Sequence, residues 1–200
     1  MARMRHVVRP KVGRHHPVHV TLRLAPGVHG LRNRHAWAIL RRCFHGGRDR
    51  FGFRLNHFSI QHTHIHMIAE ADDARALARG MQGLCIRIAY HVNKHLERSG
   101  KVLADRYHVH VLKTPRETRH ALAYCLLNAR RHAAQEGLML PRDWYDPYSS
   151  AGYFDGWADG MPPPPEELAP IVPARTWLLT TGWRRHRLII PWEVPASARE

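Results

Sequence analysis

Two histidines, His64 and His66, stand at alternate positions of a stretch in which apolar and polar residues also alternate. A period of two is typical of a half-buried β-strand, so the residues between them are expected to face the core while both imidazoles point to the other side. Imidazoles on one face of a strand, two residues apart, are close enough to bind the same divalent metal ion. The chain has 18 histidines, and His108 and His110 repeat the spacing, so such a pair also arises by chance.

A tyrosine, Tyr124, occupies an unusual place on a helix predicted over residues 115–134. At about 100° per residue, the apolar residues of this helix gather on one side, and Tyr124 lies roughly opposite them. His120 precedes it by one turn, Asn128 follows it by one turn, and Arg131 lies on the same face. A tyrosine with polar neighbours on both sides is not an ordinary core tyrosine. The alternative is a surface tyrosine whose ring lies against a neighbour.

The charge of the chain indicates a polyanionic partner. There are 31 Lys+Arg against 16 Asp+Glu, a formal net charge of +15. A high-GC genome favours arginine codons, but that bias does not explain why acidic residues are half as common. Arginine binds phosphate bidentately, so nucleic acid is the partner we expect.

The remaining composition favours an ordinary soluble protein of the cytoplasm. Hydrophobic residues make up 44% of the chain, which is enough for one globular core. The three cysteines are widely spaced and odd in number, which argues against a disulfide framework or a cysteine-rich zinc site. We see no secretory signal at the start and no apolar run of about 18 residues that would span a membrane.

The order of the predicted elements is β-α-β-β-α-β-α. The segment Thr114-Pro115-Arg116-Glu117 is the best-marked boundary, because it contains a capping box with proline at the first helical position. With the middle strands antiparallel, this order predicts an α+β sandwich with helices on one face of the sheet. The expected strands are 18–24, 51–60, 64–70 and 106–112, and the expected helices are 32–45, a long one after Asp72 or Asp73, and 115–134.

We expect three regions along the chain. Residues 1–15 form a basic N-terminal arm, residues 16–138 form the domain that carries the candidate site, and residues 139–200 form an aromatic and proline-rich appendage that partly packs on the domain. The tail aromatics are expected mainly to pack over the domain edge, with stacking on unpaired bases as the alternative. The basic segment 182–187 is the better binding candidate in the tail.

The order of these motifs resembles a known family. A strand with His-hydrophobic-His, a long helix, the strand Asp105-Arg106-Tyr107-His108, and then Tyr124 with Asn128 four residues on are similar to the single-tyrosine HUH transposases. Within them the chain resembles most the REP-associated tyrosine transposase branch of the IS200-like group. The resemblance covers residues 15–135 and is most specific over 105–132.

The resemblance implies a ferredoxin-like (RRM-like) α+β fold and an enzyme that cuts and rejoins single-stranded DNA at hairpin-marked ends. It implies that His64 and His66 bind a metal ion, that Tyr124 is the nucleophile, and that Asn128 completes the metal ligands. One departure is that relatives usually have Asn-Pro after the tyrosine, whereas Ala129 follows Asn128 here.

The chemistry implied by the resemblance is consistent with the residue types. Phenolate formation near pH 7 costs about 4 kcal/mol for an ordinary tyrosine. Mg²⁺ or Mn²⁺ on two histidines and an amide would keep open positions for phosphate oxygens. In-line attack by Tyr124 would then give a 5′-phosphotyrosine and a free 3′-OH, and rejoining would need no ATP. The arginines expected to hold the DNA are Arg106, Arg116, Arg119, Arg130, Arg131, Arg184, Arg185 and Arg187.

Three other interpretations remain open at this point. The segment 62–68 nearly matches the histidine-triad pattern of nucleotide hydrolases, with Thr63 breaking the alternation. The segment His19-Val20-Thr21-Leu22 resembles one half of the paired HxT motif of 2H phosphoesterases, without a second well-formed copy. A non-catalytic regulator that binds single-stranded nucleic acid is the third. The sequence also leaves open whether the protein is a monomer or a homodimer.

Overall fold

The computed structural model describes residues 11–160, 162 and 168–196. Most of the predicted N-terminal arm, residues 1–10, and three of the four consecutive prolines, residues 163–165, lie outside this range.

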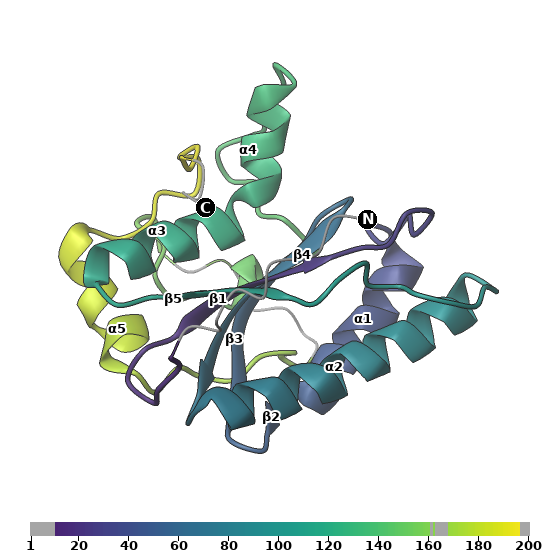
Figure 1. Cartoon of the computed structure of the whole chain (residues 1–200). Helices are drawn as coiled ribbons and strands as arrows, with labels where there is room; N and C mark the ends of the chain where they lie inside the picture. The colour runs from purple at the N-terminus through teal and green to yellow at the C-terminus, as the bar shows by residue number, and fades with distance from the viewer. Residues whose placement is uncertain (1–10, 161, 163–167, 197–200) are drawn as a thin grey trace, which may run out of the picture.

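Five strands form one antiparallel sheet (Figure 1). They are β1 (Val18–Arg23), β2 (Asp49–Arg50), β3 (Phe53–Ile60), β4 (His64–Ala71) and β5 (His108–Val111), in the order β2-β3-β4-β1-β5. Without the short β2, the order is that of a ferredoxin-like sheet, with a helix following β1 and another following β4. The predicted α+β fold class is confirmed.

Two long helices, α1 (Arg34–Gly47) and α2 (Ala74–His95), cover one face of the sheet. Each begins at a residue whose side chain accepts a backbone N–H three residues on, Asn33 for α1 and Asp73 for α2. Gly80 of α2 lies directly over Phe53 of β3, where an added Cβ would come within 2.2 Å of the phenylalanine side chain. Alternate apolar residues of the strands complete this core, among them Val18, Val20, Leu22, Ile65, Met67 and Ala69.

The third helix, α3 (Pro115–Leu126), lies on the opposite face of the sheet (Figure 1). The expectation of helices on one face therefore holds for α1 and α2 but not for α3. Ile68, which points away from the α1 and α2 core, packs with Leu122 and Cys125 of α3. The predicted capping box is confirmed, since Thr114 accepts from the Glu117 N–H and the Glu117 carboxylate accepts from the Thr114 N–H.

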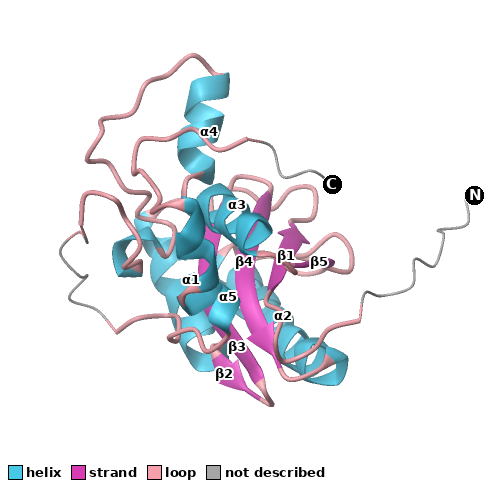
Figure 2. Cartoon of the chain, turned by 90° about the vertical axis from the view of Figure 1, so that its left-hand side faces the viewer, coloured by secondary structure: helices cyan, strands magenta, loops and turns pink. Residues whose placement is uncertain are grey.

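The single helix predicted over 115–134 is wrong, because the chain breaks at Leu127 and a second helix, α4 (Asn128–Gln135), follows. Figures 1 and 2 show α4 rising steeply from α3. The four residues from Cys125 to Asn128 are all buried. A straight helix would spread four consecutive side chains over about 300°, so the bend allows all of them to be covered.

The C-terminal segment packs on the same face as α3. It contains the short helices η1 (Ala151–Tyr153), α5 (Trp177–Thr180) and η2 (Gly182–His186). Trp157 and Trp183 are at most 2% exposed, and their indole N–H groups donate to the carbonyls of Ala151 and Leu179. These two tail aromatics therefore pack on the domain as expected, but inside a core cluster rather than over the domain edge. Among the described residues, no helix is long and apolar enough to cross a membrane.

Candidate active site

The two histidines of β4 lie on the face of the sheet that α3 covers. Their ring centroids are 4.4 Å apart, and the rings are nearly perpendicular. His66 is 4% exposed, whereas His64 is half-buried near the solvent edge. Thr63 Oγ1 lies 2.9 Å from His64 Nδ1, which leaves Nε2 of His64 for another partner. The predicted common face is therefore present.

Strand β1 adds two polar side chains to this face. Its register places Thr21 directly opposite His66 and His19 opposite Ile68. His19 Nε2 lies 3.2 Å from His66 Nδ1, and Thr21 Oγ1 lies 3.3 Å from the same nitrogen. The HxT spacing of His19 and Thr21 is visible in the sequence, but their place in the site was not predicted.

Tyr124 of α3 lies against the histidines of its own chain. Its ring is 5.0 Å from the ring of His66 and 5.9 Å from that of His19, in edge-on geometry both times. Arg131 lies on α4, after the helix break, and its side chain points back to Tyr124 on α3. Its guanidinium lies 5.5 Å from the centre of the Tyr124 ring, and its Nη1 lies 3.4 Å from the Tyr124 hydroxyl. His132 lies 6.2 Å from His64, ring to ring, and was not predicted.

Asn128 is the first residue of α4 and is completely buried. Neither its Oδ1 nor its Nδ2 has a hydrogen-bond partner within the described structure, and the same is true of Nε2 of His66. Unpaired buried polar atoms are rare in native proteins and cost about 1–3 kcal/mol each. Buried atoms of Arg54, Asn56, Arg87, Arg130 and Thr176 also have no partner, so what distinguishes His66 and Asn128 is that the sequence selects both as candidate ligands.

Burial keeps the site histidines neutral at pH 7. It lowers the pKa of His66 to about 2, with His19 and His64 adding repulsion. Burial also lowers the pKa of His19 and that of His64 to about 4. A neutral imidazole is the form that binds a metal ion.

A divalent metal ion at this site would need ligands besides the histidines. Within the described residues, no group of three or more histidine, cysteine or acidic side chains is arranged to bind a metal ion. Two imidazoles with the Asn128 amide would be an incomplete ligand set, to which phosphate oxygens of a substrate can be added. The unpaired atoms of His66 and Asn128 agree with such a set.

Two of the predicted DNA-binding arginines have intramolecular partners. Arg119 pairs bidentately with Glu193, at 2.8 and 2.9 Å, and donates to backbone carbonyls of the tail. Arg130 is 5% exposed and donates to the carbonyls of Leu140, Pro141 and Trp144. Both guanidinium groups hold the chain after α3 in place, and the prediction that they contact DNA stays a prediction.

The other predicted arginines differ in their surroundings. Arg106 and Arg116 are exposed near β5 and the start of α3. In the tail, Arg184 pairs with Asp155 and stacks on Trp183, Arg185 stacks on Trp177, and Arg187 is exposed. His120, predicted as a polar neighbour of Tyr124, is exposed on α3.

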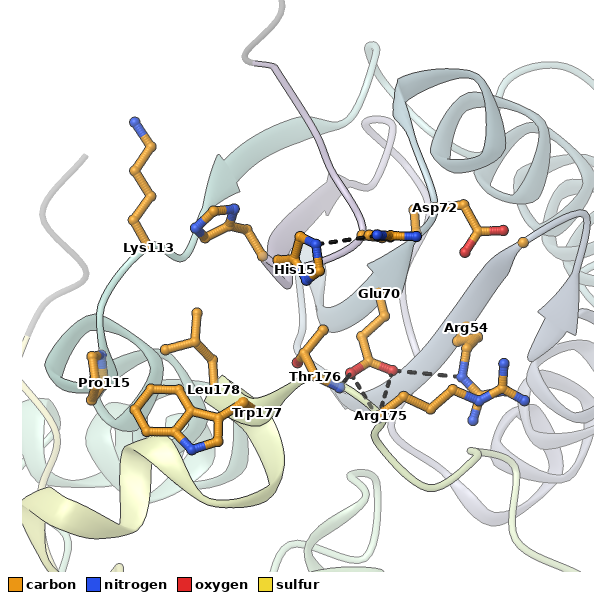
Figure 3. A pocket seen from close by; sticks show the side chains of 14 residues that line it. His15, Arg54, Glu70, Asp72, Lys113, Pro115, Arg175, Thr176, Trp177 and Leu178 are labelled. Carbon is orange, nitrogen blue, oxygen red and sulfur yellow. Dashed lines mark hydrogen bonds and ion pairs between the residues drawn. The ribbon is translucent and has the colours of Figure 1, made fainter.

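A cavity of about 510 Å³ lies at the other end of β4 (Figure 3). Glu70 points into the backbone of the tail there, where its carboxylate accepts the N–H groups of Arg175 and Thr176 at 2.6–3.0 Å. Arg54 lies 3.5 Å from the same carboxylate. This group of contacts attaches the tail to the sheet.

The chain is similar to the solved structure of a REP-associated tyrosine transposase bound to a REP hairpin. The TM-score is 0.55 with 16% sequence identity, and the match covers 74% of this chain and 82% of that one. At this identity the likeness shows the fold. No protein-family model matches the sequence, and no curated protein matches it.

Proposed function

We propose that this protein is a metal-dependent transposase that cleaves and rejoins single-stranded DNA in the cytoplasm through a 5′-phosphotyrosine. One observation carries the proposal. Tyr124 lies 5.0 Å, ring to ring, from a histidine whose Nε2 is buried and has no partner. A potential nucleophile and a free ligand atom thus meet on the sheet face where the sequence places the His-x-His pair.

His64, His66 and Asn128 would hold the metal ion, Mg²⁺ or Mn²⁺. When bound, the ion would polarise the scissile phosphate and offset the charge that develops on its oxygens. The protein's own contribution is to hold these side chains in place, with His66 Nε2 and both polar atoms of the Asn128 amide left without a partner in the chain. Tyr124 touches the histidines of its own chain, so we propose that one chain holds a complete site, whether or not the protein dimerises.

The proposed reaction is an in-line displacement at phosphorus. The Tyr124 oxygen attacks, the new Tyr–O–P bond forms as the P–O3′ bond breaks, and the departing 3′ oxygen takes up a proton. The phenolic proton leaves to solvent. Arg131, whose Nη1 is 3.4 Å from the Tyr124 hydroxyl, places a positive charge beside the reacting oxygen. Attack by an incoming 3′-OH on the phosphotyrosine reverses the sequence and restores the tyrosine.

We further propose that the substrate carries a hairpin. The support is the net charge of +15 and the hairpin named in the structural neighbour. The exposed Arg106, Arg116 and Arg187 are the side chains we expect on the DNA backbone, where phosphate contacts weaken steeply with salt.

The test is a denaturing gel of the purified protein with labelled single-stranded hairpin DNA from repeats flanking the gene, in Mn²⁺. The proposal expects a covalent protein–DNA band that disappears with a chelator and in Tyr124→Phe but remains in the matched variant Tyr90→Phe, since Tyr90 is exposed on α2. DNA binding without a covalent band would indicate the regulator. Cleavage that survives Tyr124→Phe would indicate hydrolysis by the histidines.

A further inference from the structure

We propose that His19 and Thr21 are positioning residues that fix the tautomer and the ring orientation of His66, so that its Nε2 presents a lone pair beside Tyr124. The role of the metal ion in this proposal rests on the proposed function. The tautomer of His66 is a property of the metal-free protein and can be tested by itself.

The first part of the evidence is the pairing of β1 with β4. The register places Thr21 directly across from His66, and His19 on the same face one pair further along. Side chains in such direct and diagonal positions on neighbouring strands are within contact distance. The position of His19 and Thr21 is therefore fixed by the sheet itself, and both approach His66 from the side away from β3.

The second part is that both partners meet the same nitrogen. His19 Nε2 and Thr21 Oγ1 lie 3.2 and 3.3 Å from His66 Nδ1, while His66 Nε2 is buried without a partner. If Nδ1 carries the proton, it donates to the His19 lone pair or the Thr21 oxygen, and Nε2 is left with a lone pair that a cation can occupy. In the other tautomer, Nε2 would be a buried N–H with no acceptor.

The third part is the chemistry of metal-binding histidines generally. Such a histidine usually donates its second ring N–H to a protein group, which fixes the ring and raises its basicity as a ligand. Removal of that group typically lowers metal affinity about 10- to 100-fold. Here the partners are an imidazole and a hydroxyl. His19 is 8% exposed, so water does not readily replace it.

The experiment starts from metal-free protein without DNA and has two readouts. The ¹⁵N NMR signals of the His66 ring identify the protonated nitrogen, and a Mn²⁺ titration followed by electron paramagnetic resonance gives the Kd. The variants are His19→Ala and Thr21→Val, with Thr21→Ser as the conservative change. His110→Ala is the matched control, because His110 pairs with His19 from β5 but is exposed. Thermal unfolding checks that each variant is folded.

The proposal expects the His66 proton on Nδ1 in the wild type, and a Kd for Mn²⁺ about 10- to 100-fold higher in His19→Ala and Thr21→Val. Thr21→Ser and His110→Ala should stay close to wild type. A proton on Nε2 in the wild type, or equal Mn²⁺ affinity in all folded variants, overturns it. A wild type that binds no Mn²⁺ contradicts the proposed function, and the NMR readout then decides the tautomer by itself.

Discussion

Glu70 and His66 lie on the same face of β4, four residues and roughly 13 Å apart, but their polar atoms are paired very differently. Both oxygens of the Glu70 carboxylate accept hydrogen bonds from the tail backbone, and Arg54 lies beside them. His66 is as deeply buried, yet its Nε2 has no partner. The Glu70 carboxylate is therefore fully paired at one end of β4, whereas the candidate ligand atom, His66 Nε2, has no partner at the other end.

This difference separates a structural group from a candidate functional one. A buried charge is tolerated only when it is paired, so Glu70 with its contacts is what attachment of the tail requires. Around Glu70, Arg54 Nε, Asn56 Oδ1 and Thr176 Oγ1 have no hydrogen-bond partner, but the Glu70 carboxylate itself is paired through both oxygens. At the His66 end, the unpaired atom is Nε2 of a residue that the sequence pattern selected as a ligand. Changes at the two ends should therefore affect different properties.

The largest effect is expected from His66→Gln on activity. Covalent adduct formation should fall about 100- to 10,000-fold, because a metal ion contributes several kcal/mol to such a step. The free energy of unfolding should change by no more than about 1.5 kcal/mol, the range of one hydrogen bond. Rapid-quench kinetics and urea unfolding of the same preparation check both. If His66→Gln lowered the free energy of unfolding but left the rate of adduct formation unchanged, His66 would be a structural residue like Glu70.

Glu70→Ala should show the opposite profile. Removing the carboxylate leaves the N–H groups of Arg175 and Thr176 without their acceptor and removes one ion-pair partner of Arg54, so we expect a loss of about 3–5 kcal/mol in the free energy of unfolding. The rate of adduct formation per folded molecule should remain close to wild type. Asp72→Ala, an exposed carboxylate two residues on, is the control and should cost less than about 0.5 kcal/mol. Equal losses in both variants would show that Glu70 does not attach the tail.

A fall in pH should destabilise the protein, in part because His66 is buried in its neutral form. The unfolded chain protonates His66 near pH 6.5, whereas the folded protein holds the pKa of His66 at about 2. Between these values the unfolded state binds more protons, so the free energy of unfolding falls as the pH falls, by about 1.4 kcal/mol per pH unit for one histidine. His66→Gln should make the slope between pH 5.5 and 4 shallower by about 1 kcal/mol per unit. Identical slopes in urea titrations would contradict the assigned burial.

The smallest effects are expected from single arginines. Arg106→Ala or Arg116→Ala should reduce the slope of log affinity against log salt by about 0.7, the value for one phosphate contact with single-stranded DNA. Arg119→Ala should instead cost about 1–3 kcal/mol in unfolding free energy, since it removes the partner of Glu193. Fluorescence anisotropy at several salt concentrations measures the slopes. An unchanged slope in both exposed variants would place the DNA elsewhere.

Local rules were enough to predict most of the fold. The alternation at 64–70 predicted β4, and the capping box at Thr114 predicted the start of α3, because both signals depend on neighbours within a few residues. The side of the sheet that α3 covers and the break at Leu127 were not predicted. The face depends on which side of the sheet the apolar residues of α3 meet, such as Ile68 of β4, and no glycine or proline marks the break.

The candidate site was predictable only in part, for a related reason. His64 and His66 share one strand, so their spacing alone places them on one face. His19 and Thr21 reach the site through the register between β1 and β4, a long-range property that a single sequence does not encode in any short motif. Charge alone also does not reveal that Glu193 accepts hydrogen bonds from Arg119 and that carbonyls after α4 accept them from Arg130.

The central claim is that Tyr124 becomes covalently linked to DNA beside a metal ion on His64 and His66. The most direct measurement is mass-spectrometric mapping of the protein after reaction with hairpin DNA and Mn²⁺, followed by nuclease and protease digestion. We expect a nucleotide phosphate on the peptide that contains Tyr124, attached to that tyrosine. A nucleotide on another residue, such as one of the histidines, or no modified peptide from a protein that cleaves the DNA, would contradict it.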